Sequence, residues 1–86
     1  MPEISRFYGI IIKMFHYDHQ PPHFHAELGD AQMLVAIETL TVIAGRLPPR
    51  ATGMVMEWAL EHREELRHAW ELARNKQPLD RVEPLR

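Results

Sequence analysis

The chain has 86 residues, a formal net charge of −2, a hydrophobic fraction of 45% and no cysteine. Its length suits one small domain near the lower size limit for independent folding. The missing cysteines exclude disulfides and thiolate metal sites and suit a reducing cytosol, while the slightly acidic balance argues against nucleic acid as a sole partner.

No part of the sequence resembles a membrane span or an export signal. No run approaches the roughly 20 apolar residues that a transmembrane helix requires, and the N-terminal stretch lacks the apolar centre of a signal peptide. We therefore expect a cytoplasmic protein that does not contact a membrane.

The first part of the chain begins with two predicted strands. Residues 2–8 and 10–17 are rich in β-branched and aromatic side chains, and Gly9 supplies a bend between them. Both faces of the 10–17 strand are apolar, so we expect it to be central and covered on both sides. Pro21 and Pro22 then break the pairing, because proline cannot donate a backbone hydrogen bond.

Three shorter strands are predicted after the two prolines. Residues 23–28 alternate between apolar and polar side chains, which is typical of a half-buried strand. A turn at 29–30 leads to a strand over 31–37, and a fifth strand over 41–44 is expected to end at Gly45. The short connections favour an antiparallel meander.

The second part of the chain carries one helical pattern. Apolar residues recur at three- and four-residue steps over 51–75 and form a single stripe that includes both tryptophans. A straight helix of this length would span about 38 Å, which is long for a domain with an expected radius of gyration of about 12 Å. We therefore expect a bend or break within 61–65. The tail is spaced to pack back on the body through Leu79, Val82 and Leu85.

These patterns together predict an α+β fold. An antiparallel meander sheet of four or five strands would carry a bent C-terminal helix or helix pair on one face. We expect a single domain over 1–86, with the sheet in 1–45, the helical region in 48–75 and the tail in 76–86.

Helices on one face leave the other face of the sheet to be explained. Either the Ile11, Phe15 and Tyr17 side chains or those of Ile10, Ile12 and Met14 would remain as an exposed apolar patch. Patches of more than a few hundred Å² usually mark an interface. We therefore expect a homodimer or a complex with another protein.

The densest group of reactive side chains lies between Asp18 and His25. On a strand, His23, His25 and Glu27 would share one face, and His19 could fold back across the two prolines. These residues, with Asp18 as another possible ligand, could hold a divalent transition metal such as zinc. The alternative is structural: the histidines shape the turn through hydrogen bonds, and no cofactor is bound.

A metal-independent ribonuclease is a further hypothesis for the same region. It would need a general base, a general acid and a cation beside the phosphate. Side chains of the right type are His19, His23, His25, Tyr17, Arg6 and Lys13. Histidine suits acid–base chemistry near neutral pH.

Four stretches of the chain resemble one family of small bacterial proteins. They are residues 2–9 (PEISRFYG), 19–25 (HQPPHFH), 47–50 (LPPR) and the tryptophan–histidine pattern within 58–70. The family is classed only as a domain of unknown function, and the resemblance supplies no catalytic residues. This chain has Leu40 in a turn where the family tends to have glycine.

The resemblance also implies a partner. Members of that family are often encoded beside a second small uncharacterised protein, in pairs that resemble toxin–antitoxin modules. The function we expect is therefore protein interaction within a two-gene regulatory or toxin–antitoxin-like pair. The alternative is a histidine-dependent ribonuclease or metal-binding enzyme that uses His19, His23 and His25.

Overall fold

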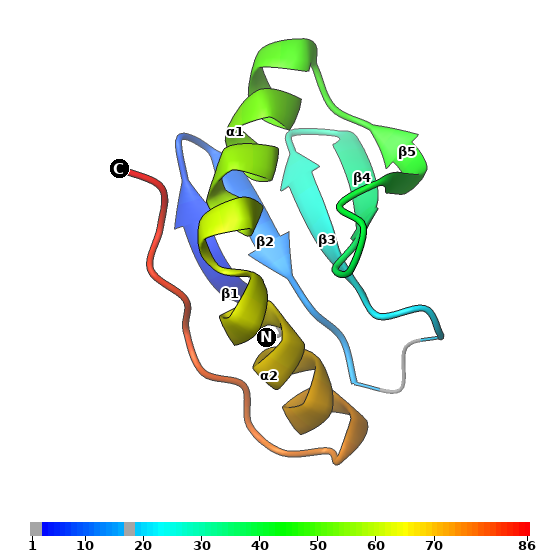
Figure 1. The fold of residues 1–86 in the computed structure, drawn as a ribbon. Coiled ribbons are helices and arrows are strands. Elements are labelled where there is room, and N and C mark those ends of the chain that lie inside the picture. Colours follow the sequence, from blue (N-terminus) through cyan, green and yellow to red (C-terminus); the bar gives the residue numbers. More distant parts are fainter. Residues whose placement is uncertain (1–2, 17–18) are drawn as a thin grey trace.

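The N-terminal half folds into a five-stranded antiparallel sheet. The computed structural model describes residues 3–16 and 19–86. Its strands lie side by side in chain order, as a meander (Figure 1). They are β1 (Glu3–Phe7), β2 (Ile10–Lys13), β3 (His23–Leu28), β4 (Ala31–Ala36) and β5 (Val42–Arg46). This sheet, with the two helices that follow it, confirms the predicted α+β fold.

Two-residue turns fix the register of the first and third hairpins. Tyr8 and Gly9 both have positive φ, 52° and 82°, which is the backbone of a type I′ turn and matches the twist of the strands it joins. The third hairpin also has a two-residue turn, at 29–30, which places Leu28 opposite Ala31. The register therefore places most of the apolar side chains of neighbouring strands on one face of the sheet and most of their polar side chains on the other.

The strand β2 ends at Lys13 and not at Tyr17, as the sequence pattern predicted. Lys13 lies opposite Glu3, the first residue of β1, so the pairing with β1 ends there. Tyr17 lies outside the described residues. Within the chain itself only one face of β2 is covered, because Ile12 is fully buried whereas Ile11 is only half-buried.

Gly45 does not end the last strand, which continues to Arg46. The glycine has a φ of 68° and lies so close to β4 that an added Cβ would be 2.1 Å from the carbonyl oxygen of Gln32. Only glycine fits this close approach, so a residue that we interpreted as a strand terminator is instead a strand-packing residue.

The turn before β5 also contains a left-handed residue. Leu40 has a φ of 56°, and its backbone N–H donates to the carbonyl oxygen of Ala36. This conformation is one that glycine adopts freely and that costs other residues free energy. The structure thus gives a physical reason for glycine at this place in the family pattern.

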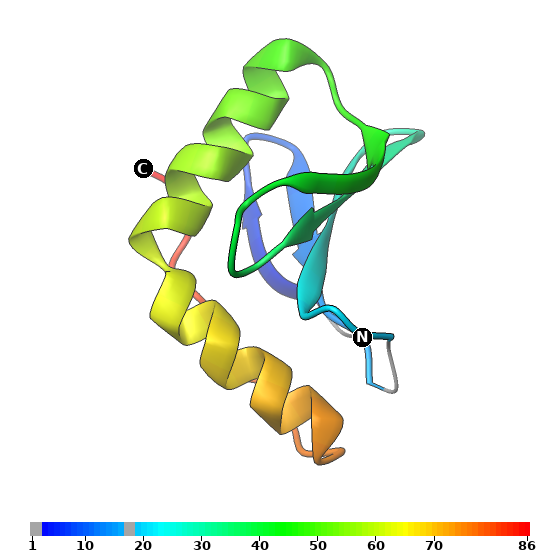
Figure 2. The ribbon, with the colours of Figure 1, turned by 45° about the vertical axis from the view of Figure 1, so that its right-hand side comes forward.

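The helical pattern divides into two helices at His62. Helix α1 spans Pro49–Glu61 and α2 spans Arg63–Arg74. The helices follow one another with a change of direction at their junction (Figure 2). The predicted break is confirmed, and Glu64 and Glu65 lie in the first turn of α2, where the helix dipole favours acidic side chains. Neither helix is long and apolar enough to cross a membrane.

Both helices bury their apolar stripe against one face of the sheet. Trp58 of α1 is fully buried, with its ring 5.5 Å from that of Phe7 and 5.7 Å from that of Phe24. Trp70 of α2 is 3% exposed. The two tryptophans are therefore core residues, as their position on the stripe predicted.

The C-terminal tail runs back past β1 (Figure 1). The backbone N–H of Val82 donates to the carbonyl oxygen of Ile4 over 2.7 Å, so the tail binds the outer edge of the sheet. The ring Nε2 of His16 donates to the carbonyl oxygen of Gln77 over 3.0 Å. Val82 is buried, and Leu79 and Leu85 pack against the core, which confirms the docking that we expected.

Candidate functional site

The residues from His19 to Pro22, which we call the histidine turn, lead directly into His23, the first residue of β3. His23 is 5% exposed, and its Nδ1 donates to the carbonyl oxygen of Pro21 over 2.7 Å. The carbonyl oxygen of Pro22 accepts a 3.0 Å hydrogen bond from the backbone N–H of Ile37, just after β4. The peptide bond between Gln20 and Pro21 is cis. The turn is thus joined to the sheet through its own backbone.

An aromatic cluster surrounds the two strand histidines. The ring centroids of His23 and His25 are 5.3 Å apart, and His23 lies 5.4 Å from Trp70 of α2. Phe15, two residues beyond β2, meets His25 edge-on at 4.6 Å. We call Phe15, His23, His25 and Trp70 the histidine–aromatic cluster. It brings together two of the three predicted histidines.

Hydrogen bonds determine which ring nitrogen carries the proton in the two clustered histidines. The amide Nε2 of Gln32 donates to Nδ1 of His25 over 3.1 Å, so the proton of a neutral His25 ring lies on Nε2. His23 instead carries a proton on Nδ1, because its partner is a carbonyl oxygen. The Nε2 atom of His23 is buried, and that of a neutral His25 ring carries the proton, so His25 would have to lose this proton or change tautomer to ligate a metal ion.

The remaining predicted site residues are divided between the described and undescribed parts of the chain. His19 is exposed in the loop before the prolines. Tyr17 and Asp18 lie outside the described residues. Among the residues 3–16 and 19–86, no three His, Cys, Asp or Glu side chains are grouped closely enough to hold a metal ion. The metal hypothesis therefore remains a prediction.

The cationic candidates are already engaged in ion pairs. Nζ of Lys13 lies 3.0 Å from Oε1 of Glu27, the fourth predicted metal ligand. Arg6 donates to both carboxylate oxygens of Glu3, over 2.8 and 3.2 Å. Binding a phosphate at either cation would have to compete with a carboxylate.

These contacts shift the titration of the Glu3 carboxyl. Hydrogen bonds from Arg6 and then from Arg81 lower its pKa from 4.5 to about 2. The same contact raises the pKa of Arg6 above its ordinary value, chiefly through the hydrogen bond to Glu3. Glu3 therefore joins β1 to the tail at neutral pH, because Arg81 lies 3.1 Å from its Oε2.

An ion pair fixes α2 beside the cluster. Arg67 donates from Nε and Nη2 to both oxygens of Glu38, each over 2.8 Å, and it also contacts Glu64. The hydrogen bond from Arg67 lowers the pKa of the Glu38 carboxyl. Because Glu38 belongs to the turn between β4 and β5, the pair connects that turn to the helix that carries Trp70.

Sequence reasoning missed Gln32 and Trp70 as neighbours of the histidines. A two-residue turn at 29–30 places Glu27 opposite Gln32 and His25 opposite Leu34, which puts Gln32 diagonal to His25. That neighbour was therefore available from the hairpin signal. The contact of Trp70 with His23 was not, because it depends on where α2 lies relative to the sheet.

Comparison with known proteins places the chain in a family. The model of a domain of unknown function, DUF4160, matches residues 9–71. The chain belongs to the DUF4160 family. The matched region begins after β1 and includes strands β2 to β5, the histidine turn, all of α1 and most of α2. No curated protein and no solved structure matches the chain.

Proposed function

We propose that this DUF4160 protein is a protein-interaction component of a two-gene regulatory pair of the toxin–antitoxin kind, acting in the bacterial cytoplasm. Its partner would be the product of the neighbouring gene. The family as such carries no assigned function, so the support comes from the surface of the sheet and from the gene-pair resemblance.

The observation that supports the proposal is the face of the sheet opposite the helices. The cross-strand pairs align Lys13, His25 and Leu34 on this face, with Ile11 and Glu27 in the adjacent row. All five side chains are half-buried, and Phe15 joins them through His25. We call these six residues the outer sheet face.

The composition of this face is that of an interface. Ile11, Phe15 and Leu34 supply apolar area around a single ion pair, Lys13–Glu27. Protein interfaces combine an apolar, aromatic centre with a small number of satisfied polar groups. Neither α1 nor α2 covers this face, since both bury their apolar residues against the opposite one. A partner protein would remove Ile11, Phe15 and Leu34 from water.

Light scattering of the pure protein, alone and mixed with the product of the neighbouring gene, tests the proposal. We expect a complex with the neighbour that Leu34→Asp weakens about tenfold or more, because a carboxylate would be buried without a partner. Leu60→Asp is the matched control, since Leu60 is 64% exposed on α1. A monomer that ignores the neighbour would contradict the proposal, and a homodimer sensitive to Leu34→Asp would redirect it to self-association.

A histidine-dependent ribonuclease or metal enzyme is the second candidate. The observation that favours it is the half-buried ring of His25, which could supply one proton-transfer group and lies 5.3 Å from the buried ring of His23. The engagement of Arg6 and Lys13 with carboxylates weighs against it. Cleavage of RNA by the pure protein, abolished by His25→Gln and retained in Leu60→Asp, would favour this candidate.

A further inference from the structure

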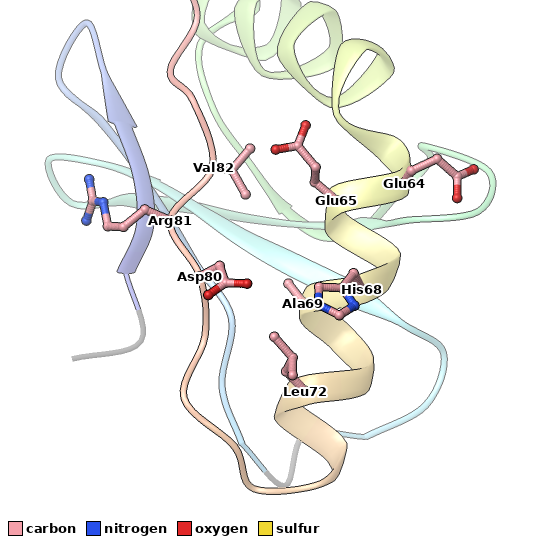
Figure 3. A pocket seen from close by; sticks show the side chains of 8 residues that line it. All are labelled: Glu64, Glu65, His68, Ala69, Leu72, Asp80, Arg81 and Val82. Atoms are coloured by element: carbon pink, nitrogen blue, oxygen red, sulfur yellow. The ribbon is translucent and has the colours of Figure 1, made fainter.

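A groove separates α2 from the C-terminal tail. It has a volume of about 410 Å³ and lies on the opposite side of α2 from Arg67 and Trp70. Its apolar lining consists of the half-buried Leu72 beside the buried side chains of Ala69 and Val82. The side chains of Leu72 and Val82 project into the space between the helix and the tail (Figure 3). This surface suits an aliphatic chain several carbons long.

Carboxylates flank the apolar surface of the groove. Glu65 and Asp80 extend into the groove from its two walls, whereas Arg81 turns away from it toward β1 (Figure 3). Oε1 of Glu65 lies 2.6 Å from Nδ1 of His62, so one oxygen of this carboxylate is already engaged. The guanidinium of Arg81 is held there by Glu3. Asp80 has no ion-pair partner among the described residues. The groove therefore combines an apolar floor with a negative rim.

A second group of carboxylates lies further along the seam between the helices and the tail. A second hollow of about 340 Å³ lies between the end of α1 and the last residues, and Glu57, Glu61 and Glu83 line it. Glu83 pairs with Arg86, whereas Glu57 and Glu61 have no ion-pair partner in the described part of the chain. Carboxylates on low-dielectric walls attract cations to the seam between the helices and the tail.

Both walls of the groove are fixed before any ligand arrives. The tail is held to β1 by the hydrogen bond from Val82 to Ile4 and to α1 by that from Trp58 to Glu83. The helix is held by the burial of Ala69 and its neighbours on the stripe. A preformed groove loses little conformational entropy on binding.

We propose that this groove binds an arginine or lysine side chain of the partner protein. The aliphatic part of that side chain would lie on the half-buried Leu72, and its cationic head would meet Asp80 and the Glu65 oxygen that His62 does not hold. An anion would be repelled by the same carboxylates. A compact metal ion does not fit the spacing, because no three metal-ligating groups converge among the described residues. The source of the side chain rests on the proposed function; the chemistry of the groove does not.

Titration with N-acetyl-arginine amide, followed by the backbone amide signals of the protein in NMR, tests the groove directly. We expect shifts at His68, Leu72 and Val82, and none with N-acetyl-citrulline amide, which has nearly the same shape without the charge. Asp80→Asn with Glu65→Gln should weaken the arginine response about tenfold. Glu71→Gln is the matched control, because Glu71 lies on α2 away from the groove and pairs with Arg74.

Several outcomes would overturn this inference alone. They are an equal response to citrulline, a response elsewhere on the surface, an undiminished response in the double variant, or no response to millimolar arginine. Failure of the neighbour complex in light scattering would instead contradict the proposed function. If the variant with both Asp80→Asn and Glu65→Gln bound the neighbour as tightly as the wild type, the groove would not contribute to the interface, and this would also overturn its role.

Discussion

The indole nitrogen of Trp58 donates a 2.8 Å hydrogen bond to the carbonyl oxygen of Glu83, 25 residues further along the chain. A fully buried core residue thereby holds the backbone of an otherwise irregular tail. The indole nitrogen of Trp70 is also buried, but it has no hydrogen-bond partner among the described residues. The two tryptophans are therefore a natural pair for comparison.

Trp58→Phe should cost more stability than Trp70→Phe. The first change removes both packing and the bond to the tail, and we expect the free energy of unfolding to fall by about 2–3 kcal/mol. The second removes packing together with an unsatisfied donor, so we expect a loss of about 1 kcal/mol. Urea unfolding measures both values, and hydrogen exchange should speed up in the tail only for Trp58→Phe. Equal losses would contradict the role of the hydrogen bond.

Two substitutions of glycine by alanine should change the stability of the protein in opposite directions. In Gly45→Ala the new Cβ would overlap the Gln32 carbonyl oxygen at a positive φ, so we expect a loss of about 3 kcal/mol or more. Gly53 lies inside α1, and no atom lies within 4 Å of its added Cβ. Gly53→Ala should therefore raise stability by about 0.5–1 kcal/mol. Thermal unfolding of the two variants measures the difference, and a tolerated Gly45→Ala would show that β5 can move away from β4.

The Glu3 carboxylate should contribute to stability only above strongly acidic pH. Its pKa is lowered to about 2 in the folded protein from 4.5, so its contribution is present above pH 4.5 and is lost as the pH falls through about 2. Glu3→Gln should therefore be less stable than the wild type at pH 7 and equally stable below pH 2. Urea unfolding at a series of pH values measures this. A difference that is constant with pH would contradict the ion pairs with Arg6 and Arg81.

The isolated protein should bind zinc weakly or not at all. Nδ1 of His23 and Nδ1 of His25 are occupied by hydrogen bonds, and Glu27 is paired with Lys13. A metal would thus have to compete for Glu27 and recruit further ligands from the exposed loop. Calorimetry at neutral pH tests this. Submicromolar binding at one site per chain that disappears in His23→Ala and in His25→Ala would favour the metal enzyme.

The sequence predicted the sheet and helices well because their signals are local. Gly9 and the turn at 29–30 marked two hairpins, and the length of the helical stripe required the break that occurs at His62. The residue at which β2 ends is not determined by a local signal. Met14 and Phe15 have strand propensity, but in the described part of the chain β1 begins at Glu3, opposite Lys13, and pairs with neither of them. Propensity alone cannot report where a neighbouring strand runs out.

The candidate site was predictable only in part. Alternation along 23–28 grouped His23 with His25, whose rings lie 5.3 Å apart, whereas Gln32, which the hairpin register places diagonal to His25, was missed. The ion pair of Arg81 with Glu3 depends on a tail that returns past β1, because the two residues are 78 positions apart in sequence. Sequence spacing gives no measure of such a contact, whereas the Arg6–Glu3 pair joins residues only three apart within β1.

Over residues 3–16 and 19–86, neither outer strand of the sheet offers a regular edge to another molecule. The tail covers β1, and the opposite strand, β5, carries an irregularity beside Leu34 and Val35 and a left-handed residue at Gly45. Such irregular edges oppose the backbone pairing by which sheets join end to end and aggregate. A partner would therefore recognise this protein through its side chains and not through backbone hydrogen bonds to a strand edge. A single substitution should then be able to change its choice of partner while the sheet stays intact.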